Sequence, residues 1–193
     1  MPDANSEPST DSRTLWGVSE DERSEWTRAR AGDTHAFAAV FDRHESRAFA
    51  HARQLLTSRE DAKDAVTVAF YELWRKRAQV RLVEGSPLPW LLNTVAFTAR
   101  NLERSSRRYR GLLHRLPPPA PSGPVVAVDE SGALAALKRL PSREQSVMVL
   151  TVLEGYPERD VARALGIPVG TVKSRLNRAK ARLRTELEGM EFL

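Results

Sequence analysis

The side chains best suited to binding chemistry in this sequence are cationic, and they lie in two separate clusters. The first cluster runs from Arg100 to Leu116 and holds Arg100, Arg104, Arg107, Arg108, Arg110 and Arg115, opposed only by Glu103. The second runs from Val169 to Thr185 and holds Lys173, Arg175, Arg178, Lys180, Arg182 and Arg184, with no acidic residue. Guanidinium and ammonium groups gathered in this way bind phosphates, so the two clusters indicate a polyanion contacted at two places. Two solvated helix faces are the alternative interpretation.

The net charge of +5 hides an uneven distribution of charge along the 193 residues. Residues 1–25 carry a net charge of −5, and the rest of the chain therefore carries +10. Residues 1–21 are rich in Pro, Ser, Asp and Glu and lack an apolar period, which predicts a disordered acidic tail.

Several function classes are excluded by composition. The chain has no cysteine, which rules out disulfides, thiolate metal sites and a cysteine nucleophile. Its histidines lack the close spacing of metal ligands, and we expect them to be ordinary surface or packing residues: His35, His44, His51 and His114. There is no glycine-rich phosphate loop and no Ser-His-Asp order. We therefore expect no catalytic residue, no metal and no cofactor.

The sequence shows no signal peptide and no membrane-spanning segment. Its first residues lack both a basic start and an apolar stretch, and apolar runs elsewhere fall far below the roughly 18 residues that a spanning helix needs. We expect a cytoplasmic protein that does not insert into membranes.

The cationic clusters must be positioned by helices, because no segment has the pattern of a β-strand. In the front half, apolar residues recur at helical spacing in four segments, which predicts four helices. These are a short helix over about 20–30, a helix that starts near Asp33, a helix opened by Ser58, and a long helix after the break at Ser86-Pro87-Leu88-Pro89. This last helix carries the first cationic cluster.

A proline-rich segment separates the two halves of the chain. Residues 117–130 hold repeated prolines that cannot continue a helix, so they predict an extended linker. Beyond it we expect helices over Ala133–Leu140, over Arg143–Leu153 with a Ser142/Gln145 capping box, over Glu158–Leu165, and from Val169 onward. The sequence thus predicts an all-α protein of two small helical domains, 22–116 and 131–187, followed by a tail over 188–193.

The last two helices have the pattern of a helix-turn-helix. Ala162 is small where the helices would cross, Gly166 tolerates the turn, and apolar positions surround both. The second helix would enter the major groove of DNA with Thr171, Lys173, Ser174, Arg175 and Arg178 on or near its outer face. Arg175 is suited to bidentate reading of guanine, while Thr171 and Ser174 can donate to phosphates or base edges.

Motifs in both halves together form the pattern of a known family. The front half contains Arg30-Ala31-Gly32-Asp33-x-x-Ala36-Phe37, Asp61-Ala62-x-Asp64-Ala65-Val66-x-x-x-Phe70-x-x-x-Trp74, and Trp90-Leu91-Leu92 with Ala99-Arg100-Asn101-Leu102. The back half contains Leu140-Pro141-x-x-x-Gln145, Gly155-Tyr156-Pro157-Glu158-Arg159-Asp160-Val161-Ala162, Leu165-Gly166 and Gly170-Thr171-Val172-Lys173-Ser174-Arg175-Leu176-x-Arg178-Ala179. With these motifs the chain resembles, over roughly residues 22–187, bacterial sigma factors of the extracytoplasmic-function (ECF) group of the sigma-70 family.

The resemblance implies partners and roles for particular residues. Domain 2 of such a factor binds core RNA polymerase, here through Asp61, Asp64, Val66, Phe70 and Trp74. The same domain opens and holds the minus-ten element, here through Ser86, Leu88, Arg100, Asn101, Arg104, Arg107 and Arg108. Domain 4 binds the minus-thirty-five element of promoter DNA through the helix-turn-helix residues given above. The resemblance also implies control by an anti-sigma factor and a monomer when the protein is free.

Some positions depart from the family pattern, and other interpretations remain open. Thr67 and Val68 stand where the family often has Gln-Glu, Phe97 stands where many members have Asn, and Pro157 replaces the usual Ser or Thr cap. One alternative is a stand-alone helix-turn-helix regulator that needs no polymerase. Another is a module whose basic helices bind an acidic protein.

Overall fold

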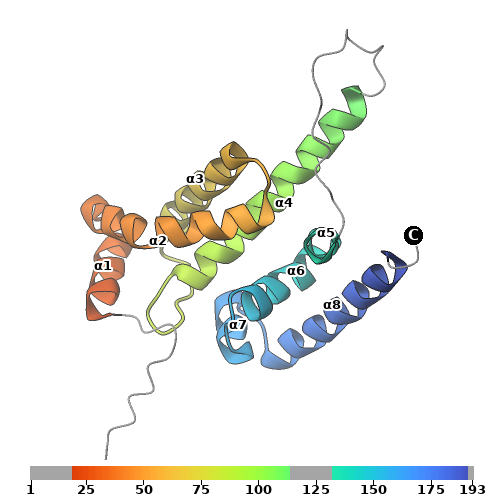
Figure 1. Cartoon of the computed structure of the whole chain (residues 1–193). Helices are drawn as coiled ribbons and strands as arrows, with labels where there is room; N and C mark the ends of the chain where they lie inside the picture. Colours follow the sequence, from red (N-terminus) through yellow and green to blue (C-terminus); the bar gives the residue numbers. More distant parts are fainter. Residues whose placement is uncertain (1–18, 114–131, 191–193) are drawn as a thin grey trace, which may run out of the picture.

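The computed structural model describes residues 19–113 and 132–190, and every regular element in these two ranges is helical. The front half consists of α1 (Glu20–Ala31), α2 (Thr34–Leu55), α3 (Arg59–Arg75) and α4 (Leu88–Leu113) (Figure 1). The back half consists of α5 (Ala133–Arg139), α6 (Ser142–Met148), the π-helical turn η1 (Val149–Leu153), α7 (Glu158–Leu165) and α8 (Val169–Met190). The predicted all-α fold with a helix-turn-helix is confirmed.

Local sequence signals set most helix starts and stops. The Asp33 side chain accepts hydrogen bonds from the backbone N–H groups of His35 and Ala36, and the Ser58 side chain accepts one from Asp61. Gly166 ends α7 in the left-handed conformation, with φ 64°, which a glycine adopts without steric cost. The predicted start of the second and third helices and the predicted turn of the helix-turn-helix are therefore confirmed.

Other boundaries differ from the prediction. No side chain caps α6: Pro141 holds the N-cap position and Ser142 lies inside the helix, so the predicted capping box is wrong. The helix α1 spans Glu20–Ala31, capped by Ser19, which agrees with the helix predicted over about 20–30, although its first two residues lie within the segment 1–21 predicted as a tail. In the same way α8 continues to Met190, beyond the predicted end of the back domain. The proline-rich segment 117–130 lies outside the described residues.

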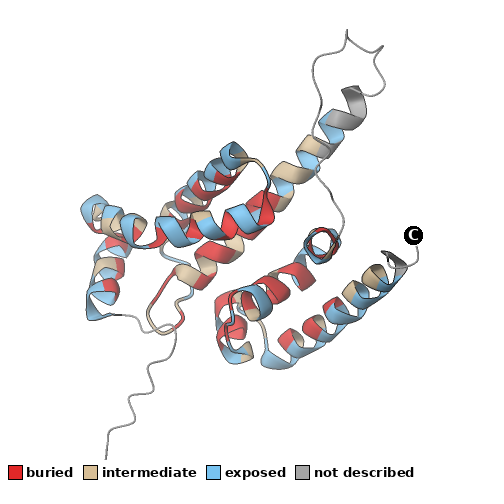
Figure 2. Ribbon diagram, in the orientation of Figure 1, coloured by how far each residue is buried: buried red, intermediate tan, exposed pale blue. Residues whose placement is uncertain are grey.

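The buried residues lie mainly on the sides of the helices that face other helices (Figure 2). In the front half Trp26, Leu73, Leu91 and Leu92 are fully buried, and α2, α3 and α4 pack against one another around them. In the back half Val147, Leu150, Val161 and Val172 fill the space between α6, η1, α7 and α8. The apolar cluster continues from one half to the other, because α4 packs against α6, η1 and α7.

No helix in the described part of the chain is long and apolar enough to cross a membrane. The same residues contain no group of three or more His, Cys, Asp or Glu side chains placed to hold a metal ion.

Candidate nucleic-acid interface

The outer face of α8 presents the second cationic cluster to solvent. Lys173, Ser174 and Arg178 are exposed, while Thr171 and Arg175 are half-buried at the start of the helix. The hydroxyl of Ser174 donates to the backbone carbonyl of Thr171 at 3.1 Å, so in this state it is directed back along the helix. The inner side of the first two turns of α8 is buried through Val172 and Leu176, so only their outer side, with Lys173 and Ser174, is exposed to solvent.

One acidic side chain divides the cations of α8 into two groups. Glu144 of α6 is buried, and its carboxylate lies 3.5 Å from Nε of Arg178 and 3.1 Å from Nε of Arg182. Lys173 and Arg175 form no ion pair with any other described residue. Arg178 thus has a structural partner that the sequence did not reveal, whereas Lys173 and Arg175 keep their charges available for phosphates and bases.

The first cationic cluster lies along one side of α4. Asn101, Arg104 and Arg108 are exposed and Arg100 is half-buried, whereas the side chain of Arg107 lies outside the described part of the chain. Phe97 belongs to the same side by its spacing and is 54% exposed, which is unusual for a phenyl group. The result is an aromatic ring followed by cations on one helix face, a combination that suits unpaired nucleotides.

Ser86 does not belong to that exposed surface. It is buried, its hydroxyl accepts a hydrogen bond from the N–H of Leu88 at 3.1 Å, and it thereby holds the start of α4. Burial raises the pKa of the neighbouring Glu22, but hydrogen bonds with His44 and Ser86 lower it. The lowering effects together are larger, so the pKa of Glu22 lies below its usual value. Ser86 is thus a structural cap in this conformation and Leu88 is half-buried, so the assignment of these two residues to the minus-ten element stays a prediction.

A third surface, acidic and apolar, lies on α3. Asp64 is exposed and Asp61 half-buried, as expected for a contact surface, but Val66 and Phe70 are only 5% and 4% exposed and pack inside. The exposed apolar residues are instead Val68 at 44% and Tyr71 at 63%. They follow Asp64 by four and seven residues, a spacing that places all three on one helix face and that sequence reasoning had overlooked.

A shallow groove adjoins this α3 surface. It has a volume of about 330 Å³ and is lined by Thr34, Phe37, Phe70, Tyr71 and Trp74. The rings of Phe37 and Trp74 lie 5.0 Å apart, and the guanidinium of Arg77 lies 4.2 Å from the Trp74 ring centre. Trp74 is half-buried and in contact with both Phe37 and Arg77. We call Asp64, Val68, Tyr71 and this groove the α3 surface.

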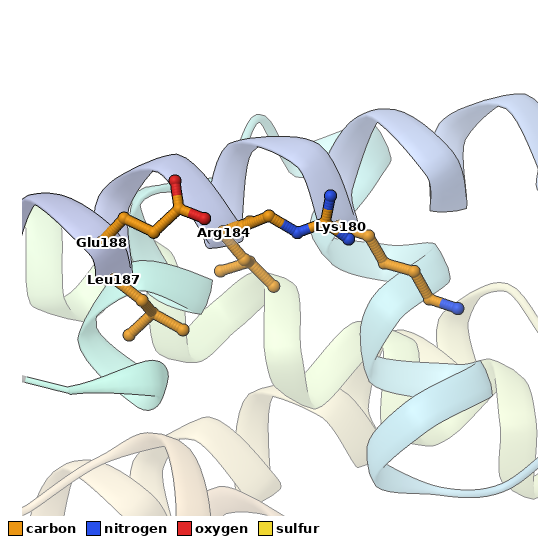
Figure 3. A pocket seen from close by; sticks show the side chains of 5 residues that line it. Lys180, Arg184, Leu187 and Glu188 are labelled. Atoms are coloured by element: carbon orange, nitrogen blue, oxygen red, sulfur yellow. The ribbon is translucent and has the colours of Figure 1, made fainter.

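A further hollow lies at the C-terminal end of α8. Its lining side chains are Lys180, Leu183, Arg184, Leu187 and Glu188 (Figure 3). All five come from one helix, and Leu187 and Glu188 point to different sides of it. Because no polar group from a second element converges there, the hollow is an open helix face and not a binding site.

Comparisons with known proteins identify the family of this chain. The family described as Sigma-70 region 2 matches residues 40–109, and the family described as Sigma-70, region 4 matches residues 133–183. The ECF RNA polymerase sigma factor SigM of Mycobacterium tuberculosis is 32% identical over 161 residues, which cover 79% of this chain and 78% of that protein. The RNA polymerase sigma-E factor of Streptomyces avermitilis is 33% identical over 154 residues, covering 73% and 79%.

A solved structure shares the fold. CnrH, determined in complex with the cytosolic domain of CnrY, superposes with a TM-score of 0.56 at 24% identity, covering 88% of this chain and 99% of that one. The likeness extends over both helical halves.

Proposed function

Because this chain belongs to the ECF group of the sigma-70 family of RNA polymerase sigma factors, we propose that its α3 surface binds core RNA polymerase while α4 and α8 bind promoter DNA. The observation that carries this assignment is the separation of an acidic and apolar surface on α3 from the two cationic helices. A single polyanion would be repelled by Asp61 and Asp64, so the α3 surface calls for a partner of different chemistry.

We assign the minus-thirty-five element to the first turns of α8. The helix-turn-helix geometry directs this part of a recognition helix into the major groove, where Arg175 can bind guanine through two hydrogen bonds. Lys173 and Thr171 would bind the phosphates beside it. Arg178 contributes charge while remaining near Glu144.

We assign the minus-ten element to the outer face of α4. Arg104 and Arg108 would bind the phosphates of the separated strand, and Asn101 can bind an exposed base edge. The exposed ring of Phe97 offers a stacking surface to an unpaired base, which an asparagine at this position would contact through hydrogen bonds instead. Sigma factors are initiation factors, and the polymerase carries out the phosphoryl transfer.

The stand-alone regulator is the less favoured interpretation. It would use α7 and α8 alone, and it leaves no role for the exposed Val68 and Tyr71 or for the cations of α4.

We also propose that an anti-sigma protein covers the α3 surface and the cationic faces of α4 and α8 in the cytoplasm. Adding the anti-sigma protein to the free factor should then prevent the factor from binding core polymerase. If the factor still binds core polymerase unhindered, this regulation by an anti-sigma protein is refuted.

Transcription with purified components tests the proposed function. We expect core polymerase together with this protein to start transcription at a cognate promoter, while the protein alone binds the same promoter poorly. Co-purification with core polymerase is the accompanying measurement. Tight repressor-like binding to duplex DNA, combined with no association with core polymerase, would contradict the proposal and favour the stand-alone regulator.

Replacing Lys173 by alanine should weaken promoter binding to a similar extent for every sequence. Lys173 is exposed and has no ion pair with another described residue, so its loss removes one phosphate contact and no internal one. The slope of log affinity against log salt concentration should therefore fall by about 1. Lys63→Ala on α3, measured with saturating core polymerase, is the control: Lys63 is also exposed and forms no ion pair with another described residue, but it lies outside the helix-turn-helix, and we expect no comparable change.

A further inference from the structure

A tight turn leads into α4, and its backbone is strained. Val83 and Ser86 exchange backbone hydrogen bonds, with N–O distances of 3.1 and 2.9 Å, so Glu84 and Gly85 form a two-residue turn between them. Their φ angles are 54° and 103°, and both are positive, as in a type I′ turn. Within the described ranges Glu84 is the only residue other than glycine with a positive φ. A glutamate disfavours this conformation, so contacts with other elements must hold it.

The first of these contacts comes from Arg23 of α1. Both Nε and Nη2 of Arg23 donate to the backbone carbonyl of Glu84, at 3.2 and 3.0 Å. The side chain of Arg23 also lies against Gly85, where an added Cβ would come within 2.7 Å of its Cγ and Nε. Arg23 and Glu84 are 61 residues apart in sequence, so the tertiary fold brings α1 against the turn.

A second contact of α1 fixes the end of the same turn. Glu22 is 7% exposed, and its carboxylate accepts a hydrogen bond from the hydroxyl of Ser86. The same hydroxyl accepts a hydrogen bond from the N–H of Leu88, the first residue of α4. Oε1 of Glu22 also lies 3.1 Å from Nε2 of the buried His44 in α2. Ser86 therefore links α1 to the start of α4.

These contacts act on a loop that adjoins the minus-ten surface. The body of α4 is held by its packing against α2 and α3, whereas the turn before it is held by Arg23 and Glu22. Ser86 and Leu88, which the resemblance assigns to the minus-ten element, follow the turn directly. Because the hydroxyl of Ser86 is already paired on both sides, the loop can offer an unpaired nucleotide mainly its shape, and the turn determines that shape.

We propose that Arg23 is a positioning residue for the minus-ten element, which holds the Glu84–Gly85 turn in the conformation that receives an unpaired nucleotide. The inference rests on the proposed function for its consequence, whereas the contact with the turn is a property of the free chain. The family match begins at residue 40, after α1, so it assigns no role to this helix. Without Arg23 the strain of Glu84 is not balanced, and binding weakens in proportion to the fraction of molecules in which the turn is formed.

Amide hydrogen exchange in the free protein tests the contact with the turn. The N–H groups of Val83 and Ser86 are paired within the turn, so they exchange only when it opens. We expect Arg23→Ala to raise both exchange rates by about tenfold or more, because a left-handed glutamate is then held by fewer contacts. Unchanged exchange rates would overturn the proposal.

Glu84→Gly provides the matched rescue. Glycine adopts a positive φ without steric cost, so with glycine at this position the turn no longer depends on Arg23. In the Arg23→Ala background, Glu84→Gly should return the exchange rates to within about threefold of the original. If exchange stays fast in the double variant, Arg23 does not act through the strained turn, and the proposal is overturned.

The consequence for promoter binding is measured on holoenzyme formed with saturating core polymerase. One probe is a labelled single strand that carries the minus-ten element of a promoter mapped by its transcription start, and the other is a duplex that carries its minus-thirty-five element. We expect Arg23→Ala to weaken binding of the single strand by about tenfold and to leave binding of the duplex within about twofold. Adding Glu84→Gly should restore binding of the single strand.

Arg28→Ala separates positioning from charge. Arg28 is exposed on the same helix, and its guanidinium lies 4.0 Å from the carboxylate of Asp33, so its replacement removes the same charge without touching the turn. We expect binding of both probes to stay within about twofold of the original. An equal loss from Arg28→Ala would overturn the positioning role. So would a loss from Arg23→Ala that lowers the salt slope by about 1 and that Glu84→Gly does not restore, because Arg23 would then bind phosphate directly.

The two measurements distinguish this inference from the proposed function. Faster exchange in Arg23→Ala with unchanged binding of the single strand would overturn the role of the turn in minus-ten binding. No binding of the single strand by the unmodified holoenzyme would overturn the assignment of the minus-ten element and leave the exchange result intact.

Discussion

Replacing Tyr71 by alanine should weaken the binding of core RNA polymerase by about 30-fold or more, equivalent to about 2 kcal/mol or more. Tyr71 is 63% exposed beside the groove formed by Phe37 and Trp74, and tyrosine is among the residues that most often dominate interfaces. Because the ring is exposed in the free protein, its loss leaves no internal cavity. A titration of purified core polymerase with labelled protein measures the change, and thermal unfolding should be almost unaffected.

Tyr109→Ala is the matched control for this measurement. Tyr109 is also an exposed tyrosine, 64% accessible, but it lies on α4 away from the α3 surface. We expect its replacement to leave the affinity for core polymerase within about threefold of the original. Equal losses from both replacements, or no loss from Tyr71→Ala, would show that the α3 surface is not where the polymerase binds.

Asp64 should act mainly on the rate of association. It is exposed at the edge of the α3 surface, where a charge is screened by salt and steers the encounter more than it adds affinity. The apolar residues and the acidic residue of this surface thus have different tasks, although the sequence pattern groups them together.

The helices were predictable where a local signal determines them. Asp33 and Ser58 cap their helices and Gly166 closes α7, each through contacts with residues at most four positions away. The Ser142 prediction failed for an equally local reason, since Pro141 adopts an extended conformation one residue earlier and begins the helix there. A serine three residues before a glutamine does not determine which residue becomes the cap.

The site was less predictable because exposure depends on neighbours that are distant in sequence. Val66 and Phe70 match the family motif, yet they are buried because α2 packs against that face of α3. Ser86 lies in a break that reads as a surface loop, but the fold places it against Glu22. The sequence predicts an ordinary histidine at position 51, because nothing in the sequence links His51 to Glu154, whose Oε1 lies 2.6 Å from its Nδ1.

Replacing Arg175 by alanine should relax the preference for one base pair of the minus-thirty-five element. A bidentate contact with guanine is worth about 1–3 kcal/mol, so discrimination at that base pair should fall by about 5- to 150-fold. Arg175 is suited to this role because it lies in the second turn of α8 and forms no ion pair with another described residue. Mapping transcription starts after overexpression of this protein identifies the cognate promoter. Binding of the holoenzyme to single-base variants of that promoter then measures the base preference at each position.

Arg175→Lys separates base reading from charge. Lysine keeps the positive charge but cannot reproduce the planar pair of donors, so the salt dependence of binding should stay near the original while the base preference is lost. Lys173→Arg, at a position assigned to phosphate, should change neither property appreciably. If Arg175→Lys retains full discrimination, or Arg175→Ala weakens binding to all variants equally, then Arg175 binds phosphate and the sequence is read by another side chain of α8.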